Sequence, residues 1–279
     1  MAAKHPHIPR ILLAFDFDRT LATDSVEAIC AAYGISRDEW EQEFEAPLGD
    51  GWDEIVRRGQ ALIDLGRAKD RPLSKAVMRD AAGEIDLYPG VLEMPDRLRQ
   101  AAAEVTDCEL EFVVLSSGYD EIIAETGVAD AFDRILASGF ESDEEDRLFC
   151  VKRIVGHPAK ALYLEALGKG LPLDGSNAPE RAGERVEDAD MHCPFDQMIY
   201  LGDGASDLQA FAFLTGAGGL AIALDKDGDY ARDADPTPAQ RVDAVLRPDY
   251  SEGAPLYEAL RHAVLSCAHR IALRGTERG

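Results

Sequence analysis

Two aspartates separated by a single residue, Asp16 and Asp18, directly follow the apolar run at 11–15. A run of this length predicts a strand buried on both faces, and the aspartates lie at its end, where open α/β sheets bind ligands. Two carboxylates this close repel each other, and a divalent cation that neutralises one of them leaves the other free to handle protons. Because Asp is also common in turns, a solvated turn is the alternative for this pair taken alone.

Three further segments carry chemically useful side chains at the ends of predicted elements. Hydroxyl and glycine residues after a strand can hold an anion with O–H and N–H groups, and a lysine early in a helix adds positive charge. A glycine-flanked acid pair after another strand adds carboxylates. In chain order these residues are Ser116, Ser117 and Gly118 after the apolar run 112–115, Lys160 in a helix over 159–167, and Asp203 and Asp207 after the run 198–202.

This order of motifs resembles the haloacid dehalogenase superfamily, and within it the phosphoserine-phosphatase-like branch. The resemblance covers residues 11 to 224. It implies an α/β fold with a three-layer Rossmann-like core, a parallel sheet and a small helical C1-type cap domain. It also implies a Mg²⁺-dependent phosphatase that hydrolyses a small phosphomonoester through an aspartyl-phosphate intermediate.

The resemblance also implies a role for each motif residue. Covalent catalysis by a carboxylate divides one difficult hydrolysis into two easier steps, and general acid–base catalysis contributes about 10²–10⁴-fold. Hard oxygen ligands favour Mg²⁺. The implied roles are nucleophile for Asp16, acid and base for Asp18, phosphate binding for Ser116, Ser117 and Gly118, charge neutralisation for Lys160, Mg²⁺ binding for Asp16, Asp203 and the backbone carbonyl of Asp18, and orientation of Lys160 or of a metal-bound water for Asp207.

The residues around the first motif bear on the substrate. Dehalogenases of the superfamily lack an acid at the position of Asp18, because a halide leaving group needs no proton, so Asp18 favours phosphate esters. Phosphoserine phosphatases carry a glutamate for the substrate amine where this chain has Ser25. L-phosphoserine is therefore disfavoured, unless Asp24 substitutes for that glutamate. Recognition of the leaving group is expected from the cap and from Asp24 and Ser25. No role can be assigned to Arg19.

Two other functions remain open from the sequence. The same aspartyl-phosphate passed to an alcohol would make the chain a phosphotransferase or a phosphomutase. The fold could also serve as a non-catalytic binding module, but such a module does not need Asp16, Asp18, Lys160 and Asp203 together.

The segment 25–85 changes from strand to helix patterns and is expected to form the cap, with the core at 1–24 and 86–279. Ser36 and Glu39 form a capping box that opens one helix, a second is expected to carry Trp52, and 73–82 forms a third. The two tryptophans, Trp40 and Trp52, are expected in the core of the cap. The neighbouring arginines at 57–58 could reach a substrate anion, but a solvated face is expected for one or both of them.

Downstream of Ser116, the patterns predict a helix near 121–125 and a hairpin of strands at 134–140 and 148–155. His157 is expected as a helix cap or surface residue. The polar stretch 168–196 is a surface insertion of unknown role, and 254–274 predicts a final amphipathic helix.

Composition restricts the partners. The 279 residues carry a net charge of −24, which repels nucleic acid and anionic membranes. Five cysteines without metal-type spacing indicate a reducing compartment, and we expect a cytoplasmic protein because no signal peptide and no run of ~20 apolar residues is present. The expected partner is a small phosphorylated metabolite. The oligomeric state cannot be predicted.

Overall fold

The fold is centred on a seven-stranded sheet in the order β4-β3-β2-β1-β5-β6-β7, seen in a computed structural model that describes residues 6–173, 180–225 and 242–276. All neighbouring strands pair in parallel except β3 and β4, which form an antiparallel hairpin. The strands are β1 (Arg10–Phe15), β2 (Glu109–Tyr119), β3 (Arg134–Ser142), β4 (Leu148–Arg153), β5 (Met198–Gly202), β6 (Leu220–Leu224) and β7 (Ala244–Leu246).

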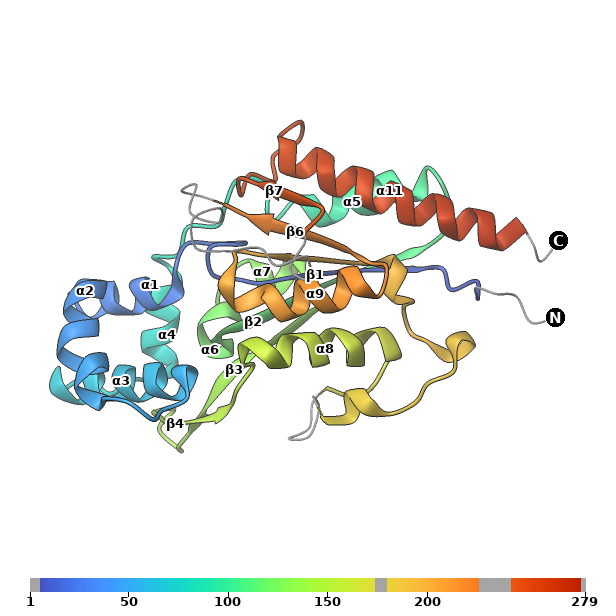
Figure 1. Ribbon diagram of the computed structural model, residues 1–279. Coiled ribbons are helices and arrows are strands. Elements are labelled where there is room, and N and C mark those ends of the chain that lie inside the picture. Colours follow the sequence, from blue (N-terminus) through green and yellow to red (C-terminus); the bar gives the residue numbers. More distant parts are fainter. Residues whose placement is uncertain (1–5, 174–179, 226–241, 277–279) are drawn as a thin grey trace.

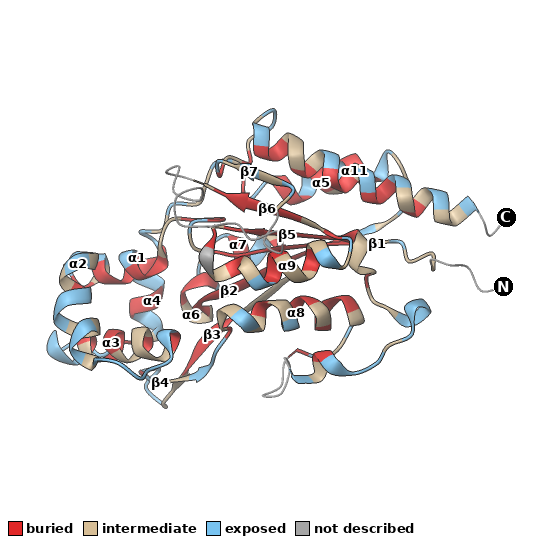
Figure 2. Cartoon of the chain, viewed as in Figure 1, coloured by how far each residue is buried: buried red, intermediate tan, exposed pale blue. Residues whose placement is uncertain are grey.

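Helices cover both faces of the sheet and make three layers (Figure 1). On one face, α8 (His157–Lys169) and α9 (Leu208–Gly216) pack against alternate β1 residues such as Leu12 and Ala14. The opposite face is covered by α5 (Met94–Ala103) and α11 (Pro255–Thr276), with the short α6 (Asp120–Ile123) and α7 (Val128–Ala131). Figure 2 shows the central strands buried and the helices buried on one side only. The expected three-layer Rossmann-like core is confirmed.

Four helices lie together beside the sheet, beyond the carboxyl ends of its central strands (Figure 1). They are α1 (Ser25–Ala32), α2 (Arg37–Trp40), α3 (Glu54–Ala68) and α4 (Lys75–Ala82), with a π-helical turn at Glu41–Glu45 and a 3₁₀ turn at Ala46–Leu48 between α2 and α3. We call them the cap helices. The two connections to them run side by side, since Ala22 bridges to Leu87 and the amide of Thr23 donates to the carbonyl of Asp86 at 3.0 Å.

The cap helices are docked on the β3–β4 hairpin. The amide of Leu148 donates to the carbonyl of Leu73 at 2.8 Å, and Lys75 pairs with Asp146 at 2.7 Å. The phenol of Tyr119 donates to the carbonyl of Ile55 in α3 at 2.8 Å. Apolar side chains of the cap helices and of one sheet face accordingly form a single buried cluster.

Several local expectations are confirmed and one is wrong. Ser36 caps α2, where its hydroxyl accepts from the Glu39 amide at 3.1 Å, and Trp40 is fully buried. Trp52 is 44% exposed, because Asp53 caps α3 and the helix begins only at Glu54. The second tryptophan therefore lies outside both the helix and the apolar core that were expected for it.

The insertion at 168–196 is described except for residues 174–179. Its described part holds three-residue and four-residue 3₁₀ turns rather than longer helices. His192 contacts Glu111 at 2.6 Å and Arg10 at 2.5 Å, and Cys193 is buried. These contacts tie the insertion to the amino ends of β1 and β2, far from the cap helices.

Candidate active site

The register of the central strands brings the sequence motifs to one edge of the sheet. Phe15 of β1 pairs with Val114 of β2 on one side and with Leu201 of β5 on the other. In each of these strands the motif follows within a few residues of this pairing, so the three motifs lie together at the carboxyl ends of the strands. The side chains that the sequence singled out on three separate segments lie close together for this reason.

Strand alternation directs Asp16 toward α8. Leu12 and Ala14 face the cluster formed by α8 and α9, and the next residue of the same parity is Asp16. One carboxylate oxygen of Asp16, Oδ2, lies 2.9 Å from Lys160 Nζ, and the other accepts the Phe17 amide at 2.8 Å. The side chain is 5% exposed, so its charge depends on these partners.

Lys160 lies in the first turns of α8, and its ammonium group is fully buried between two carboxylates. Besides Asp16, its Nζ contacts Asp207 Oδ1 at 2.6 Å. Burial lowers the pKa of Lys160, but the charges of Asp16 and Asp207 raise it by more, so the group stays protonated. The lysine is thus a fixed positive charge beside Asp16.

Asp207 is held by two further hydroxyl groups. Tyr200 donates to its Oδ1 at 2.5 Å, and Ser206 donates to its Oδ2 at 3.1 Å. Gly202 is required here because a Cβ at that position would lie 2.3 Å from the Asp207 carboxyl carbon. The sequence-based expectation that Asp207 orients Lys160 is consistent with this geometry.

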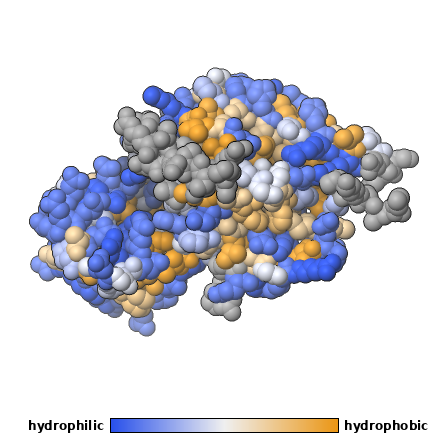
Figure 3. Space-filling view, in the orientation of Figure 1, coloured by the Kyte–Doolittle hydropathy of each residue, from blue (hydrophilic) through white to orange (hydrophobic). Residues whose placement is uncertain are grey.

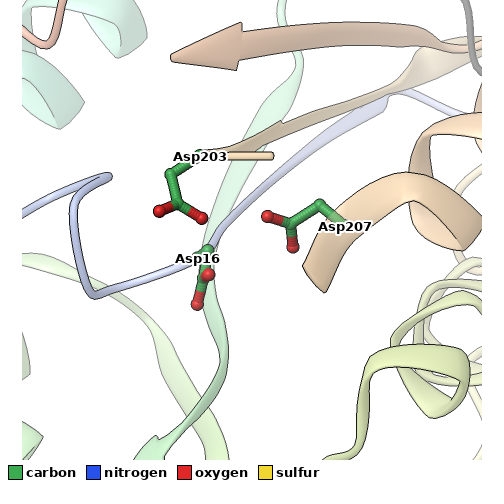
Figure 4. Close-up of side chains that lie close together, drawn as sticks. All are labelled: Asp16, Asp203 and Asp207. Carbon is green, nitrogen blue, oxygen red and sulfur yellow. The ribbon is translucent and has the colours of Figure 1, made fainter. Parts of the chain in front are cut away.

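Asp203 completes a group of three carboxylates with Asp16 and Asp207, whose oxygens lie within 4.8 Å of one another (Figure 4). Burial raises the pKa of Asp203 to about 7, and repulsion from Asp16 and Asp207 adds to the shift. Burial also raises the pKa of Asp16, against the charge of Lys160. Three carboxylates with one lysine leave an excess of negative charge that a divalent cation would neutralise.

The donor set therefore fits a magnesium ion. Carboxylate oxygens are the hard ligands that Mg²⁺ takes, and Asp207 is already committed to Lys160 and Tyr200. Asp16 and Asp203 are the side chains left to bind the ion. Asp18, the third expected ligand, turns its carboxylate elsewhere and could contribute only its backbone carbonyl.

Asp18 faces the start of α1. Its Oδ1 accepts the Ser25 amide at 2.7 Å, and its Oδ2 accepts the Ser25 hydroxyl at 3.0 Å. Burial raises the pKa of Asp18 to about 7, with repulsion from Asp24 and Asp16 added to it. A carboxyl group with this pKa can give and take a proton near neutral pH. Ser25, expected to contact the substrate, instead positions Asp18.

The expected phosphate-binding group lies at the end of β2. Ser116 and Ser117 are buried, and a register shift between Ser116 and Tyr119 marks the point where the strand departs from the ladder. The amide of Gly118 donates to the Ser116 hydroxyl at 3.0 Å. That N–H group, expected to hold a phosphate oxygen, therefore holds Ser116 in this structure.

A cleft of about 480 Å³ opens above these residues. Its walls combine the motif residues with side chains from the cap helices and from the first turn of α8. Arg37, Glu54 and His157 are among the lining residues that were not assigned to the site from the sequence, and Arg58 was expected there only as an alternative to a solvated face. Arg58 donates to Glu54 at 2.8 Å, and Glu54 lies 4.0 Å from His157. Arg58 therefore lines the cleft, which was the alternative to the solvated face expected for one or both arginines. His157 is the first residue of α8 and its side chain is 33% exposed, in keeping with the expected surface position.

These residues could not be assigned to the site from the sequence for a physical reason. Arg37, Glu54 and Arg58 lie in cap helices whose own sequence patterns are satisfied by a solvated position, and the docking of these helices turns the three side chains toward the cleft. His157 lies instead at the start of α8, which packs on the sheet. A partial signal was present in the two adjacent arginines at 57–58, of which Arg57 pairs with Glu45 at 3.5 Å.

Comparison with known proteins agrees with the geometry. A family model for haloacid dehalogenase-like hydrolases matches residues 13–212. No curated protein sequence matches the chain. Among the helices that the structure describes, none has the length and apolar character of a membrane span.

Solved structures share the fold. Phosphoserine phosphatase in its apo form is 19% identical with a TM-score of 0.58, and the match covers 91% of this chain and 98% of that one. A HAD family hydrolase from Salmonella enterica serovar Typhi is 17% identical with a TM-score of 0.57, over 88% of this chain and 69% of that one. A probable phosphoserine phosphatase from Vibrio cholerae is 16% identical with a TM-score of 0.56, over 97% and 68%.

Proposed function

Because the chain belongs to the haloacid dehalogenase-like hydrolases, we propose that it is a Mg²⁺-dependent phosphatase that hydrolyses a small phosphomonoester through an aspartyl-phosphate. The observation that carries this proposal is Asp18, a carboxyl group with a pKa raised to about 7, two residues from the buried carboxylate of Asp16. A proton donor in this position serves an alkoxide leaving group.

In the first step, a carboxylate oxygen of Asp16 attacks phosphorus while the bond from phosphorus to the ester oxygen breaks. Asp18 gives its proton to that oxygen, so the product leaves as an alcohol. In the second step, water attacks phosphorus, Asp18 takes its proton, and the bond to Asp16 breaks to release phosphate. Lys160 stays protonated throughout and offsets the negative charge beside Asp16.

Mg²⁺ would be held by Asp16, Asp203 and the backbone carbonyl of Asp18, and when bound it reduces the repulsion between the attacking carboxylate and the phosphate. Ser116 would bind a phosphate oxygen through its hydroxyl. The amide of Gly118 can join it only after leaving its bond to Ser116. Asp207 would act through Lys160.

We further propose that residues 25–85 form the cap domain, with the core at 1–24 and 86–279. The paired connections at Ala22 and Leu87 support boundaries at these positions. A cytoplasmic location is supported by the five cysteines, none of which is paired in a disulfide. The charge of −24 opposes nucleic acid as the partner, and the cleft of about 480 Å³ supports a small phosphorylated metabolite.

The decisive experiment is phosphate release from a panel of phosphomonoesters, including p-nitrophenyl phosphate, with Mg²⁺ or with EDTA. We expect Mg²⁺-dependent turnover that Asp16→Asn abolishes, because the amide matches the carboxylate in size but is a poor nucleophile. The folded state of the variant is checked by circular dichroism, and deamidation is excluded by mass spectrometry.

Two results would contradict the proposal. One is turnover by undeamidated Asp16→Asn at the wild-type rate, and the other is full activity in protein shown by elemental analysis to hold no metal. A readout independent of activity is the rise in melting temperature with Mg²⁺, which should be smaller in Asp203→Asn because a metal ligand is lost.

A further inference from the structure

We infer that the substrate carries a second anionic group on its leaving group, a carboxylate or a second phosphate, and that Arg19 binds this group. The inference rests on the proposed phosphatase function and names its substrate class. It depends on the surroundings of Asp24 and on the conformation and partners of Arg19.

Asp24 is not free to bind a substrate amine. Its side chain caps α1 by accepting the Glu27 amide at 3.0 Å, and it accepts a hydrogen bond from Arg37 at 2.9 Å. Arg19 lies on its other oxygen at 3.6 Å. Asp18 is bonded to Ser25, so in the described part of the chain both Asp18 and Asp24 already have partners and neither carboxylate is left for an ammonium group.

The guanidinium N–H groups of Arg19 are available to bind a ligand. Its side chain is 63% exposed and lines the cleft. Within the described part of the chain its guanidinium makes no hydrogen bond, and its one ion pair, with Asp24, is longer than a direct hydrogen bond. Arg37, by contrast, is held by Asp24 and by Glu41 at 2.8 Å.

The backbone at Arg19 is strained. Its φ is +58°, and the other non-glycine residues with positive φ among those described are Asp70 and Asp146. Asp is enriched in this left-handed conformation because of its short polar side chain, whereas a long side chain such as arginine is uncommon there. Strain of this kind concentrates at functional sites, where the position of one side chain matters more than its cost in stability.

The position of Arg19 matches the leaving-group side of the cleft. Asp18, which would protonate the leaving oxygen, is its chain neighbour, and Asp24 lies next to Ser25, which binds Asp18. The phosphate that reacts has other partners in Lys160, Ser116 and the metal. The guanidinium of Arg19, next to Asp18, would therefore contact the leaving group of the ester. Its planar set of N–H donors fits a carboxylate or a phosphate.

The test compares esters with matched leaving groups: phosphoglycolate, 1,3-propanediol bisphosphate, glycerol 3-phosphate and phosphoethanolamine. For the wild type with Mg²⁺, we expect kcat/KM for one of the two anionic leaving groups to exceed that for glycerol 3-phosphate by about tenfold or more, from one charge-assisted contact. Phosphoethanolamine should be the poorest. Whichever anionic ester is faster identifies the group as carboxylate or phosphate.

Arg19→Ala should reduce the ratio of kcat/KM for the anionic ester to that for glycerol 3-phosphate by about tenfold, and Arg19→Glu should bring it below one. Arg19→Gly should lose the same selectivity while raising the melting temperature, because glycine removes the strain at positive φ. The matched control is Arg67→Ala, which removes an equally exposed arginine, 64% exposed, that pairs with Asp64 in α3.

The outcomes separate this inference from the proposed function. If the esters are hydrolysed but the ratio is the same in Arg19→Ala as in the wild type, the inference is wrong and the phosphatase stands. If Asp16-dependent turnover is absent for every ester, p-nitrophenyl phosphate included, the proposed function fails and the inference fails with it.

Discussion

Lys160 sets the charge balance of the site, because it is the buried cation between Asp16 and Asp207. Lys160→Met should reduce the free energy of unfolding by about 3–5 kcal/mol, since removal of one partner leaves buried carboxylates unpaired. Urea denaturation measures this loss. Lys152→Met is the control and should change stability by less than about 0.5 kcal/mol, because Lys152 is 50% exposed and its pair with Glu141 spans 3.3 Å.

A second substitution distinguishes unpaired charge from lost packing. Asp207→Asn added to Lys160→Met should recover part of the stability, because it removes a charge that the lysine no longer balances. Losses that simply add in the double variant would show that the charge at Asp207 is not the cause.

The raised pKa of Asp203 predicts how the free energy of unfolding depends on pH when no metal is bound. Its pKa is raised from 3.8 to about 7, so between these values the folded state binds more protons than the unfolded state. The free energy of unfolding therefore falls as pH rises across this window. In EDTA, Asp203→Asn should flatten the decline and melt above the wild type at pH 7, and the difference should shrink toward pH 4. Asp18 contributes a decline in the same window, so some slope remains in the variant.

Melting temperatures between pH 4 and pH 8 in EDTA test this expectation. Mg²⁺ should then stabilise the wild type at pH 7 more than the variant, because the ion neutralises the repulsion. Equal slopes for the two proteins in EDTA would show that a raised pKa of Asp203 does not cause the fall in the free energy of unfolding.

At the scale of elements, the sequence predicts the features that depend only on the residues of one strand or one helix. Buried apolar runs identify β1, β2 and β5, and their ends locate Asp16, Ser116 and Asp203. These residues come together because the carboxyl ends of parallel strands lie at the same edge of the sheet. Arg58 and Glu54 could not be predicted in the same way. They reach the cleft through the docking of α3, which depends on contacts far away in sequence. Trp52 was misplaced because a hydrophobic residue just before the N-cap at Asp53 continues the helical pattern.

The docking of α3 on the hairpin depends on Gly59. A Cβ at this position would lie 2.3 Å from Val151 Cγ2 and 3.0 Å from the Tyr119 hydroxyl. Valine is stiff about χ1, so Gly59→Ala should cost about 1–3 kcal/mol. It should also raise KM for the substrate, because Arg58 and Glu54 on the same helix line the cleft.

Gly216→Ala is the control for Gly59→Ala. It lies at the end of α9, where a Cβ would meet nothing within 4 Å, and alanine should stabilise the helix by up to about 1 kcal/mol. Thermal unfolding and steady-state kinetics measure both effects. A Gly59→Ala protein with wild-type stability and KM would show that the α3 contact can relax without consequence.

For the whole molecule, the cleft is lined by residues of the cap helices and of the sheet edge, two parts of the chain that lie next to each other in Figure 1. A cleft of about 480 Å³ admits a small ester, and closed sites exclude larger ones. We expect small phosphorylated metabolites to be hydrolysed with higher kcat/KM than phosphoproteins or nucleic-acid ends. A phosphoprotein that exceeds every metabolite in a broad panel would overturn the enclosed-site interpretation.

The net charge of −24 acts on the approach of an anionic ester from solution. Hydrophilic side chains cover most of the visible surface of the cap helices, which form one wall of the cleft (Figure 3). The Debye length falls from about 30 Å at 0.01 M salt to about 10 Å at 0.1 M. Salt therefore screens the long-range repulsion, whereas contacts to Lys160 and Arg19 inside the cleft are shorter than either length.

We accordingly expect kcat/KM for an anionic ester to rise by roughly twofold or more between about 0.01 M and 0.15 M KCl at constant Mg²⁺. Phosphoethanolamine, whose ammonium group offsets part of its charge, should show a weaker rise. Sucrose at matched osmolality controls for effects on water activity and should change neither rate. A steady fall of kcat/KM with KCl for the anionic ester would instead mean that local attraction in the cleft outweighs the field of the whole protein.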